Sequence, residues 1–119
     1  YKSGKVETSD LKLVNDDLLQ TLNHIKKDKF RQLWLYLLLY RMSNSSENES
    51  LFAQIYSMRN TEETYLVSYD SISANFRSIS EEFIVSLLNR LLDADKPIVG
   101  TTDSNVCQYC DFKTVCKKD

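Results

Sequence analysis

The stretch that decides the fold is an apolar run in the first half of the chain, Phe30-Arg-Gln-Leu-Trp-Leu-Tyr-Leu-Leu-Leu-Tyr40. Apolar side chains fall on nearly every side of a helix built from this run. We therefore predict a helix over residues 29–42 that is buried on more than one side. The run is shorter than the roughly 20 apolar residues of a membrane span, and no membrane partner is expected.

The segments on either side of this helix predict a second helix and a hairpin. Asn15 is a favourable N-cap for a short helix, whose apolar positions up to Ile25 recur at helical spacing. Residues 51–58 and 64–69 have the composition of strands. The polar turn at 60–63 between them predicts a β-hairpin.

A third helix and a first strand complete the prediction of the fold. Ser78 and Glu81 have the spacing of a capping box, which predicts that a helix starts there, and Pro97 prevents that helix from continuing. Residues 1–6 are typical of the end of a strand with a Ser-Gly turn. The order strand, helix, helix, strand, strand, helix predicts an α/β fold with helices packed on a short mixed sheet.

All three cysteines of the chain lie close together, as Cys107, Cys110 and Cys116 in a C-x2-C-x5-C arrangement. Two intervening residues allow one turn to direct both thiolates to a common centre, and closed zinc or iron–sulfur sites use four ligands. An odd, clustered set differs from a disulfide framework and indicates a reducing compartment, for which the cytoplasm is the default. Three reduced structural thiols are the alternative. We expect an ordinary surface position for His24, the only histidine.

Two further features are ambiguous when each is taken alone. Gln32 and Tyr36 are four residues apart and share one face of the predicted helix. Gln32 bonded to backbone, with the Tyr36 hydroxyl at the surface, would explain them without any function. Lys2 stands on a strand before a glycine turn, where a lysine is usually solvated. The net charge of −2 gives no nucleic-acid footprint, so DNA binding has to rest on particular residues.

Taken in order, Tyr1-Lys-Ser-Gly-Lys5, Gln32-Leu-Trp-Leu-Tyr36 and the cysteine segment resemble the PD-(D/E)XK nucleases of the RecB/AddB type. In that family a strand carries Asp-Tyr-Lys-(Ser/Thr)-Gly, a helix carries Gln-x-x-x-Tyr, and three cysteines of this spacing end the chain. The resemblance covers essentially the whole chain. It implies a partial restriction-endonuclease-like fold, with residues 1–97 as the C-terminal half of a nuclease-like domain and residues 98–119 as a cysteine-containing tail.

The resemblance also implies an activity and the residues that carry it. The whole protein is expected to be a Mg²⁺-dependent, exonuclease-like deoxyribonuclease that acts on DNA in repair or recombination, with a helicase subunit or helicase domain as partner. Lys2 is the implied catalytic residue, and Gln32 and Tyr36 are the implied substrate-binding residues. The implied cofactor of the tail is a [4Fe-4S] cluster with a fourth cysteine from upstream, and its ligands here are Cys107, Cys110 and Cys116.

The family's acidic residue falls immediately before Tyr1, so we expect this chain to be the carboxy-terminal part of a larger protein. The ligands of Mg²⁺ then lie outside this chain. Because carboxylates supply the attraction for Mg²⁺, the fragment alone is expected to be inactive. Two alternatives are an inactive nuclease fold that binds DNA or a partner, and an unrelated zinc-binding interaction module.

Overall fold

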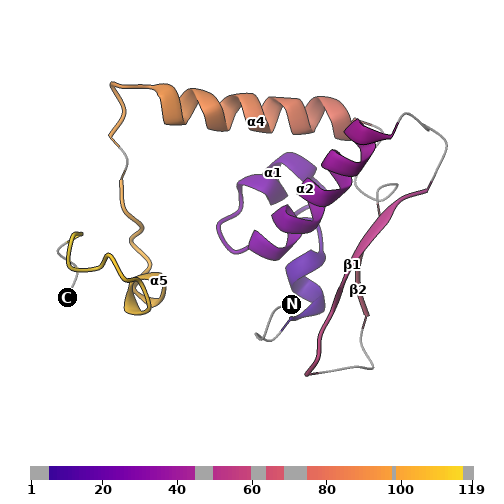
Figure 1. Cartoon of the computed structure of the whole chain (residues 1–119), viewed down its shortest axis with the longest axis horizontal. Coiled ribbons are helices and arrows are strands. Elements are labelled where there is room, and N and C mark those ends of the chain that lie inside the picture. The colour runs from indigo at the N-terminus through magenta and orange to yellow at the C-terminus, as the bar shows by residue number, and fades with distance from the viewer. Residues whose placement is uncertain (1–5, 45–49, 60–63, 69–74, 98, 117–119) are drawn as a thin grey trace. The chain divides into compact units, whose positions relative to one another are not determined.

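The computed structural model describes residues 6–44, 50–59, 64–68, 75–97 and 99–116. The chain divides into two compact units, Tyr1–Ser86 and Leu87–Asp119, and each is described by itself. The described helices and strands are, in chain order (Figure 1), the 3₁₀ helix η1 (Thr8–Leu11), α1 (Leu18–Asn23), α2 (Asp28–Ser43), β1 (Phe52–Tyr56), β2 (Thr64–Ser68), α4 (Phe76–Leu92) and α5 (Ser104–Gln108). None of the described helices is long and apolar enough to span a membrane.

A tight turn places the start of α1 two residues later than the sequence predicts. Asn15 and Asp16 have positive φ values of 51° and 56°, as in the two-residue turns that favour Asn and Asp. The Asp17 amide closes this turn by donating to the Val14 carbonyl at 2.9 Å. The Asp17 carboxylate then caps α1 by accepting from the Gln20 amide at 2.8 Å. The prediction of Asn15 as the N-cap is therefore wrong, because that residue adopts the left-handed conformation of the turn.

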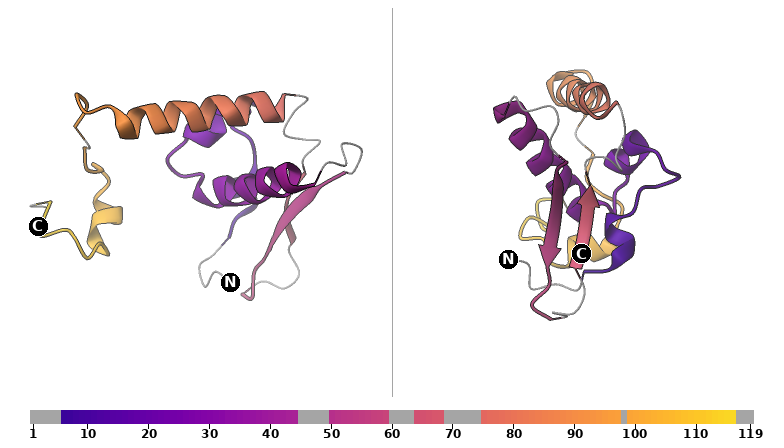
Figure 2. Two further views of the ribbon diagram at one scale, coloured as in Figure 1. Left: turned by 45° about the horizontal axis from the view of Figure 1, so that its top comes forward. Right: turned by 90° about the vertical axis from the view of Figure 1, so that its right-hand side faces the viewer.

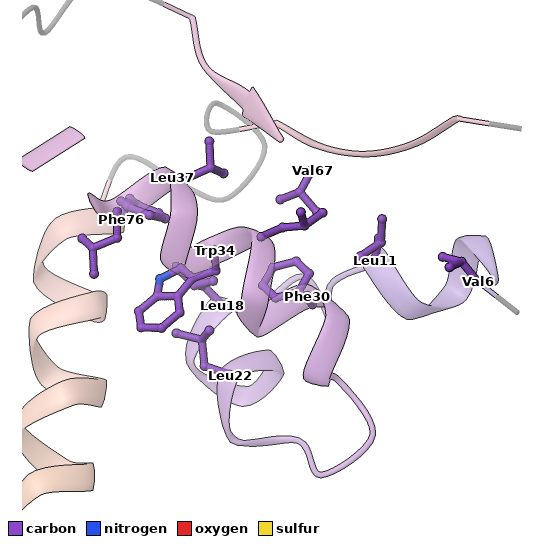
Figure 3. Close-up of a cluster of buried hydrophobic side chains, with 11 residues drawn as sticks. Val6, Leu11, Leu18, Leu22, Phe30, Trp34, Leu37, Val67 and Phe76 are labelled. Atoms are coloured by element: carbon purple, nitrogen blue, oxygen red, sulfur yellow. The ribbon is translucent and has the colours of Figure 1, made fainter. Parts of the chain in front are cut away.

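Helix α2 is the centre of the first unit, and it buries one face. Its buried side chains, with those of α1 and β2, form the apolar cluster of Figure 3, in which Leu22 lies near Trp34. On the opposite side of the helix, Leu35 is 41% exposed and Leu39 is 52% exposed. In the part of the chain that the structure describes, the prediction of burial on more than one side is therefore wrong. The buried residues of α2 are Phe30, Leu33, Trp34, Leu37 and Leu38.

A buried polar contact joins α2 to the first half of α4. Trp34 Nε1 donates to Ser80 Oγ at 2.9 Å, and Ser80 is fully buried. The Trp34 ring also meets the Phe83 ring edge to face, with centroids 5.4 Å apart and planes at 89°. Since a buried indole N–H needs an acceptor, Ser80 fixes the position at which α4 crosses Trp34.

Helix α4 starts three residues earlier than predicted, at Phe76. Phe76 is 1% exposed and belongs to the core, so the first residue of the helix is already packed. Ser78 consequently lies inside the first turn, where its hydroxyl donates to the Asn75 carbonyl at 3.1 Å. The capping-box role predicted for Ser78 and Glu81 is wrong. Glu81 forms a surface ion pair with Arg77 instead.

The two strands form an antiparallel hairpin, as predicted. Strand β1 pairs with β2 in a register that sets Ala53 opposite Val67, and the arrows in Figure 2 run in opposite directions. Val67 is buried in the core, and Ala53 and Ile55 pack against it. The turn predicted at 60–63 lies outside the described residues, as do residues 1–5 of the predicted first strand. The mixed α/β fold with a hairpin and flanking helices is confirmed.

Candidate functional site

Lys2, the candidate catalytic residue, lies outside the described residues. Four residues later, Val6 is 4% exposed and belongs to the core, and Leu11 at the end of η1 is buried in the same cluster. Val6 is thus the described core residue nearest to Lys2 along the sequence.

Gln32 and Tyr36, the candidate substrate-binding residues, are brought together by α2. Gln32 Nε2 donates to the Tyr36 hydroxyl at 2.8 Å, one turn along the helix. Tyr36 is 54% exposed, and the intervening Leu33 and the following Leu37 are buried, so the pair stands on the outer side of a fixed helix. The phenol proton, the amide oxygen and the second amide proton stay available to a ligand. Tyrosine and glutamine side chains of this kind are common donors to phosphate oxygens.

The three cysteines lie in the second unit, in α5 and in the backbone turns that follow it. Cys107 is in α5, the Cys110 amide donates to the Cys107 carbonyl at 3.2 Å, and the Cys116 amide donates to the Phe112 carbonyl at 3.2 Å. All three thiols are free, and Cys116 is exposed. Across residues 6–44, 50–59, 64–68, 75–97 and 99–116, no three His, Cys, Asp or Glu side chains are gathered as a metal site. The donor type and spacing fit a thiolate-ligated group, whereas the described conformation does not gather the sulfur atoms.

His24 has the surface position expected for it. It follows α1 as the C-cap and is exposed, and its Nδ1 accepts from the Lys26 amide at 3.2 Å. This hydrogen bond is local, between a side chain and a backbone amide two residues away.

A cluster of charged residues near the start of α2 was missed by the sequence reasoning. Lys29 Nζ lies 2.6 Å from Asp10 Oδ2, and the Glu7 amide donates to the same oxygen at 3.0 Å. Burial raises the pKa of the Asp10 carboxyl. The hydrogen bonds from Glu7 and Lys29 and the charges of Lys29 and Lys27 lower the same pKa by a larger amount. The net effect is an Asp10 pKa below its ordinary value of 3.8. The signal available in the sequence was a set of lysines at a helix N-terminus, where the helix dipole disfavours cations.

Comparison with known protein families matches residues 1–117 to the PD-(D/E)XK nuclease superfamily. No curated protein and no solved structure matches the chain. The family match includes the segment of Lys2, the helix with Gln32 and Tyr36, and the cysteine-containing segment. This chain therefore belongs to the PD-(D/E)XK nuclease superfamily.

Proposed function

We propose that this chain is part of a metal-dependent DNA nuclease of the RecB/AddB type, which hydrolyses phosphodiester bonds with an exonuclease-like action. The observation that carries the proposal is the exposed Gln32–Tyr36 hydrogen bond, in a chain of the PD-(D/E)XK nuclease superfamily. Support also comes from the order of the three motifs along the sequence. Nucleases of this superfamily typically use divalent metal ions, and Mg²⁺ is the ion proposed here for activation of the scissile phosphate and of water.

In this proposal each site residue has a defined task. Lys2 lies beside the phosphate that is cleaved, where its positive charge stabilises the negative charge that develops in the transition state. The Tyr36 hydroxyl and the Gln32 amide bind the DNA backbone. Their mutual hydrogen bond restricts both side chains before DNA arrives, which lowers the entropy that binding has to remove.

The cysteine segment is proposed to hold a [4Fe-4S] cluster together with a fourth cysteine of the whole protein. The support is three free thiols in α5 and the backbone turns after it, at the spacing that the resemblance implies. Cys107, Cys110 and Cys116 would act as structural ligands, because metal binding contributes folding free energy. The proposed partners are DNA and a helicase subunit or helicase domain, in cytoplasmic repair or recombination.

The test uses the full-length protein with three variants, Lys2→Ala, Tyr36→Phe and the control Lys26→Ala. Lys26 is an exposed lysine between α1 and α2, so its variant matches the loss of charge at Lys2. We expect Lys2→Ala to lower kcat for Mg²⁺-dependent DNA cleavage on the order of 10²–10³-fold without weakening DNA binding. We expect Tyr36→Phe to raise the Kd for DNA about tenfold, because one hydrogen bond to a charged group is lost. Lys26→Ala should match the wild type in both measurements.

Wild-type cleavage by Lys2→Ala would remove this lysine from the mechanism. DNA binding without cleavage by the wild-type full-length protein would favour the inactive, DNA-binding alternative. We also propose that residues 1–119 alone do not cleave DNA, because the resemblance assigns none of their acidic residues to the divalent ion. Cleavage by this fragment would show that some of those residues do bind it.

A further inference from the structure

Two lysines near the start of α2 occupy positions that the helix alone disfavours. Lys27 is the N-cap residue and Lys29 lies in the first turn, where the dipole repels cations. Asp28 is the acidic residue of that turn. Lysines at these positions cost the isolated helix some stability, so contacts outside α2 have to offset that cost.

Those contacts are made with η1, the segment that follows Lys2 along the chain. Lys27 Nζ donates to the carbonyls of Ser9 and Lys12, the latter at 2.8 Å. These carbonyls lie at the C-terminal end of η1, where a cation is favourable. Lys29 Nζ forms the 2.6 Å ion pair with Asp10. We call Asp10, Lys27 and Lys29 the η1 clamp.

Within the η1 clamp, the Asp10–Lys29 pair is better shielded from water than an ordinary surface ion pair. The side chains of Lys29 and Asp10 are 18% and 26% exposed, compared with 88% and 62% for Arg77 and Glu81. Exposed pairs contribute little because water and salt screen them, and screening weakens with burial. The Glu7 amide donates to the same Asp10 oxygen, so this carboxylate oxygen has two donors, one in η1's N-cap residue and one in α2. The clamp therefore adds polar contacts between η1 and α2 to the apolar packing of Leu11.

We propose that the η1 clamp positions the two halves of the nuclease site relative to each other, a role that rests on the proposed function. Lys29 precedes Gln32 by less than one helical turn, and Asp10 follows Lys2 by eight residues, with buried Val6 between them. The clamp thus joins, by polar contacts of described residues, the segment that follows Lys2 in the sequence to the helix that carries Gln32 and Tyr36. A displacement of about 1 Å can lower a rate on the order of 10²-fold, so such a connection affects catalysis without touching DNA.

The test compares Asp10→Asn, Lys29→Met and Lys29→Arg in the full-length protein, with Asp93→Asn as the control. Asp93 is matched to Asp10 in its contacts: its carboxylate pairs with Lys96 at 3.3 Å and accepts from the Asp95 amide at 3.1 Å. It lies in the second unit, outside the η1 clamp. Cleavage is measured well below the melting temperature of every variant, so that loss of folded protein does not contribute.

We expect Asp10→Asn and Lys29→Met to lower kcat at least tenfold while KM stays within about twofold, since positioning acts on the transition state. Lys29→Arg keeps the cation and should restore most of kcat, and Asp93→Asn should leave it unchanged. Lower melting temperatures with wild-type kcat for Asp10→Asn and Lys29→Met would overturn the proposal. So would an equal loss of kcat for Asp93→Asn.

Amide hydrogen exchange separates failure of the clamp from failure of the proposed function. The clamp predicts faster exchange over residues 6–12 in Asp10→Asn and Lys29→Met, and no change there in Asp93→Asn. If the wild type cleaves no DNA, the proposed function and the positioning role fail together, and the exchange data still decide whether the clamp holds η1. Unchanged exchange in an active enzyme would overturn the clamp alone.

Discussion

Replacing Trp34 by phenylalanine tests the packing on which the candidate site depends. The change removes the Nε1–H that donates to the fully buried Ser80 Oγ at 2.9 Å, and it shrinks the ring that meets Phe83. Loss of a buried donor costs about 1–3 kcal/mol, and the cavity left by the smaller ring adds to that cost. We expect Trp34→Phe to lower the free energy of unfolding by about 2–4 kcal/mol.

Ser80→Ala isolates the hydrogen bond from the change in ring size. It leaves the indole N–H of Trp34 without the Ser80 acceptor, at an expected cost of about 1–3 kcal/mol. The double variant lacks both partners of the hydrogen bond. It should therefore lose less free energy of unfolding than the sum of the losses in the two single variants, and the difference, the coupling energy, should be about 1 kcal/mol. Urea denaturation followed by circular dichroism measures all three variants. Trp34, the only tryptophan, provides a second probe in the wild type and in Ser80→Ala.

Ser78→Ala is the matched control, because it makes the same change two residues earlier in α4. Ser78 is exposed and its hydroxyl donates to the local Asn75 carbonyl, so the cost should stay within about 0.5 kcal/mol. If Ser80→Ala costs no more than Ser78→Ala, or if the coupling energy is zero, the packing of Trp34 against α4 is wrong.

Two further predictions concern the η1 clamp and the cysteine segment. Because its pKa is lowered in the folded protein, Asp10 stabilises the fold above its ordinary pKa of 3.8 and loses that contribution as the pH falls through the lowered value. Thermal melts should therefore show wild type more stable than Asp10→Asn near neutral pH, with the difference vanishing in acid; a constant difference would contradict this. Full-length protein purified without oxygen should contain iron and acid-labile sulfide, and Cys110→Ser should lose both without unfolding residues 14–95. Stoichiometric zinc without sulfide would contradict the cluster.

The types of element could be predicted from the sequence because each has a clear period, whereas the helix starts could not. Asn15, Asp16 and Asp17 are all residues that cap helices or form turns, and local propensity does not choose among them. The choice is made by Thr21, which is fully buried. Its hydroxyl donates to the Asp17 carbonyl at 2.6 Å and accepts from the Val14 amide at 2.8 Å. That arrangement places the tight turn at the first two residues and leaves Asp17 as the cap.

The candidate site was predicted only where its residues are neighbours in the sequence. Helical spacing predicts that Gln32 and Tyr36 share a face, although it does not predict the hydrogen bond between their side chains. The η1 clamp joins residues 18 and 19 positions apart, as in the contacts of Lys27 with Ser9 and of Lys29 with Asp10. Such contacts depend on how η1 packs, and a single turn of 3₁₀ helix has too short a pattern to predict.

Helix α2 links the core to the candidate site, and the two sets of variants separate its roles. Leu33 and Leu37 are buried next to Gln32 and Tyr36 in the sequence, so packing of the core fixes the backbone that carries the proposed DNA-binding pair. Damage to the core at Trp34 should therefore lower stability first, and activity only as the folded fraction falls. Damage to the η1 clamp changes partly exposed, charged side chains and removes no apolar side chain from the core, so it should lower kcat more than stability. A protein in which both sets of variants affect stability and kcat in equal proportion would have no separate positioning device at the start of α2.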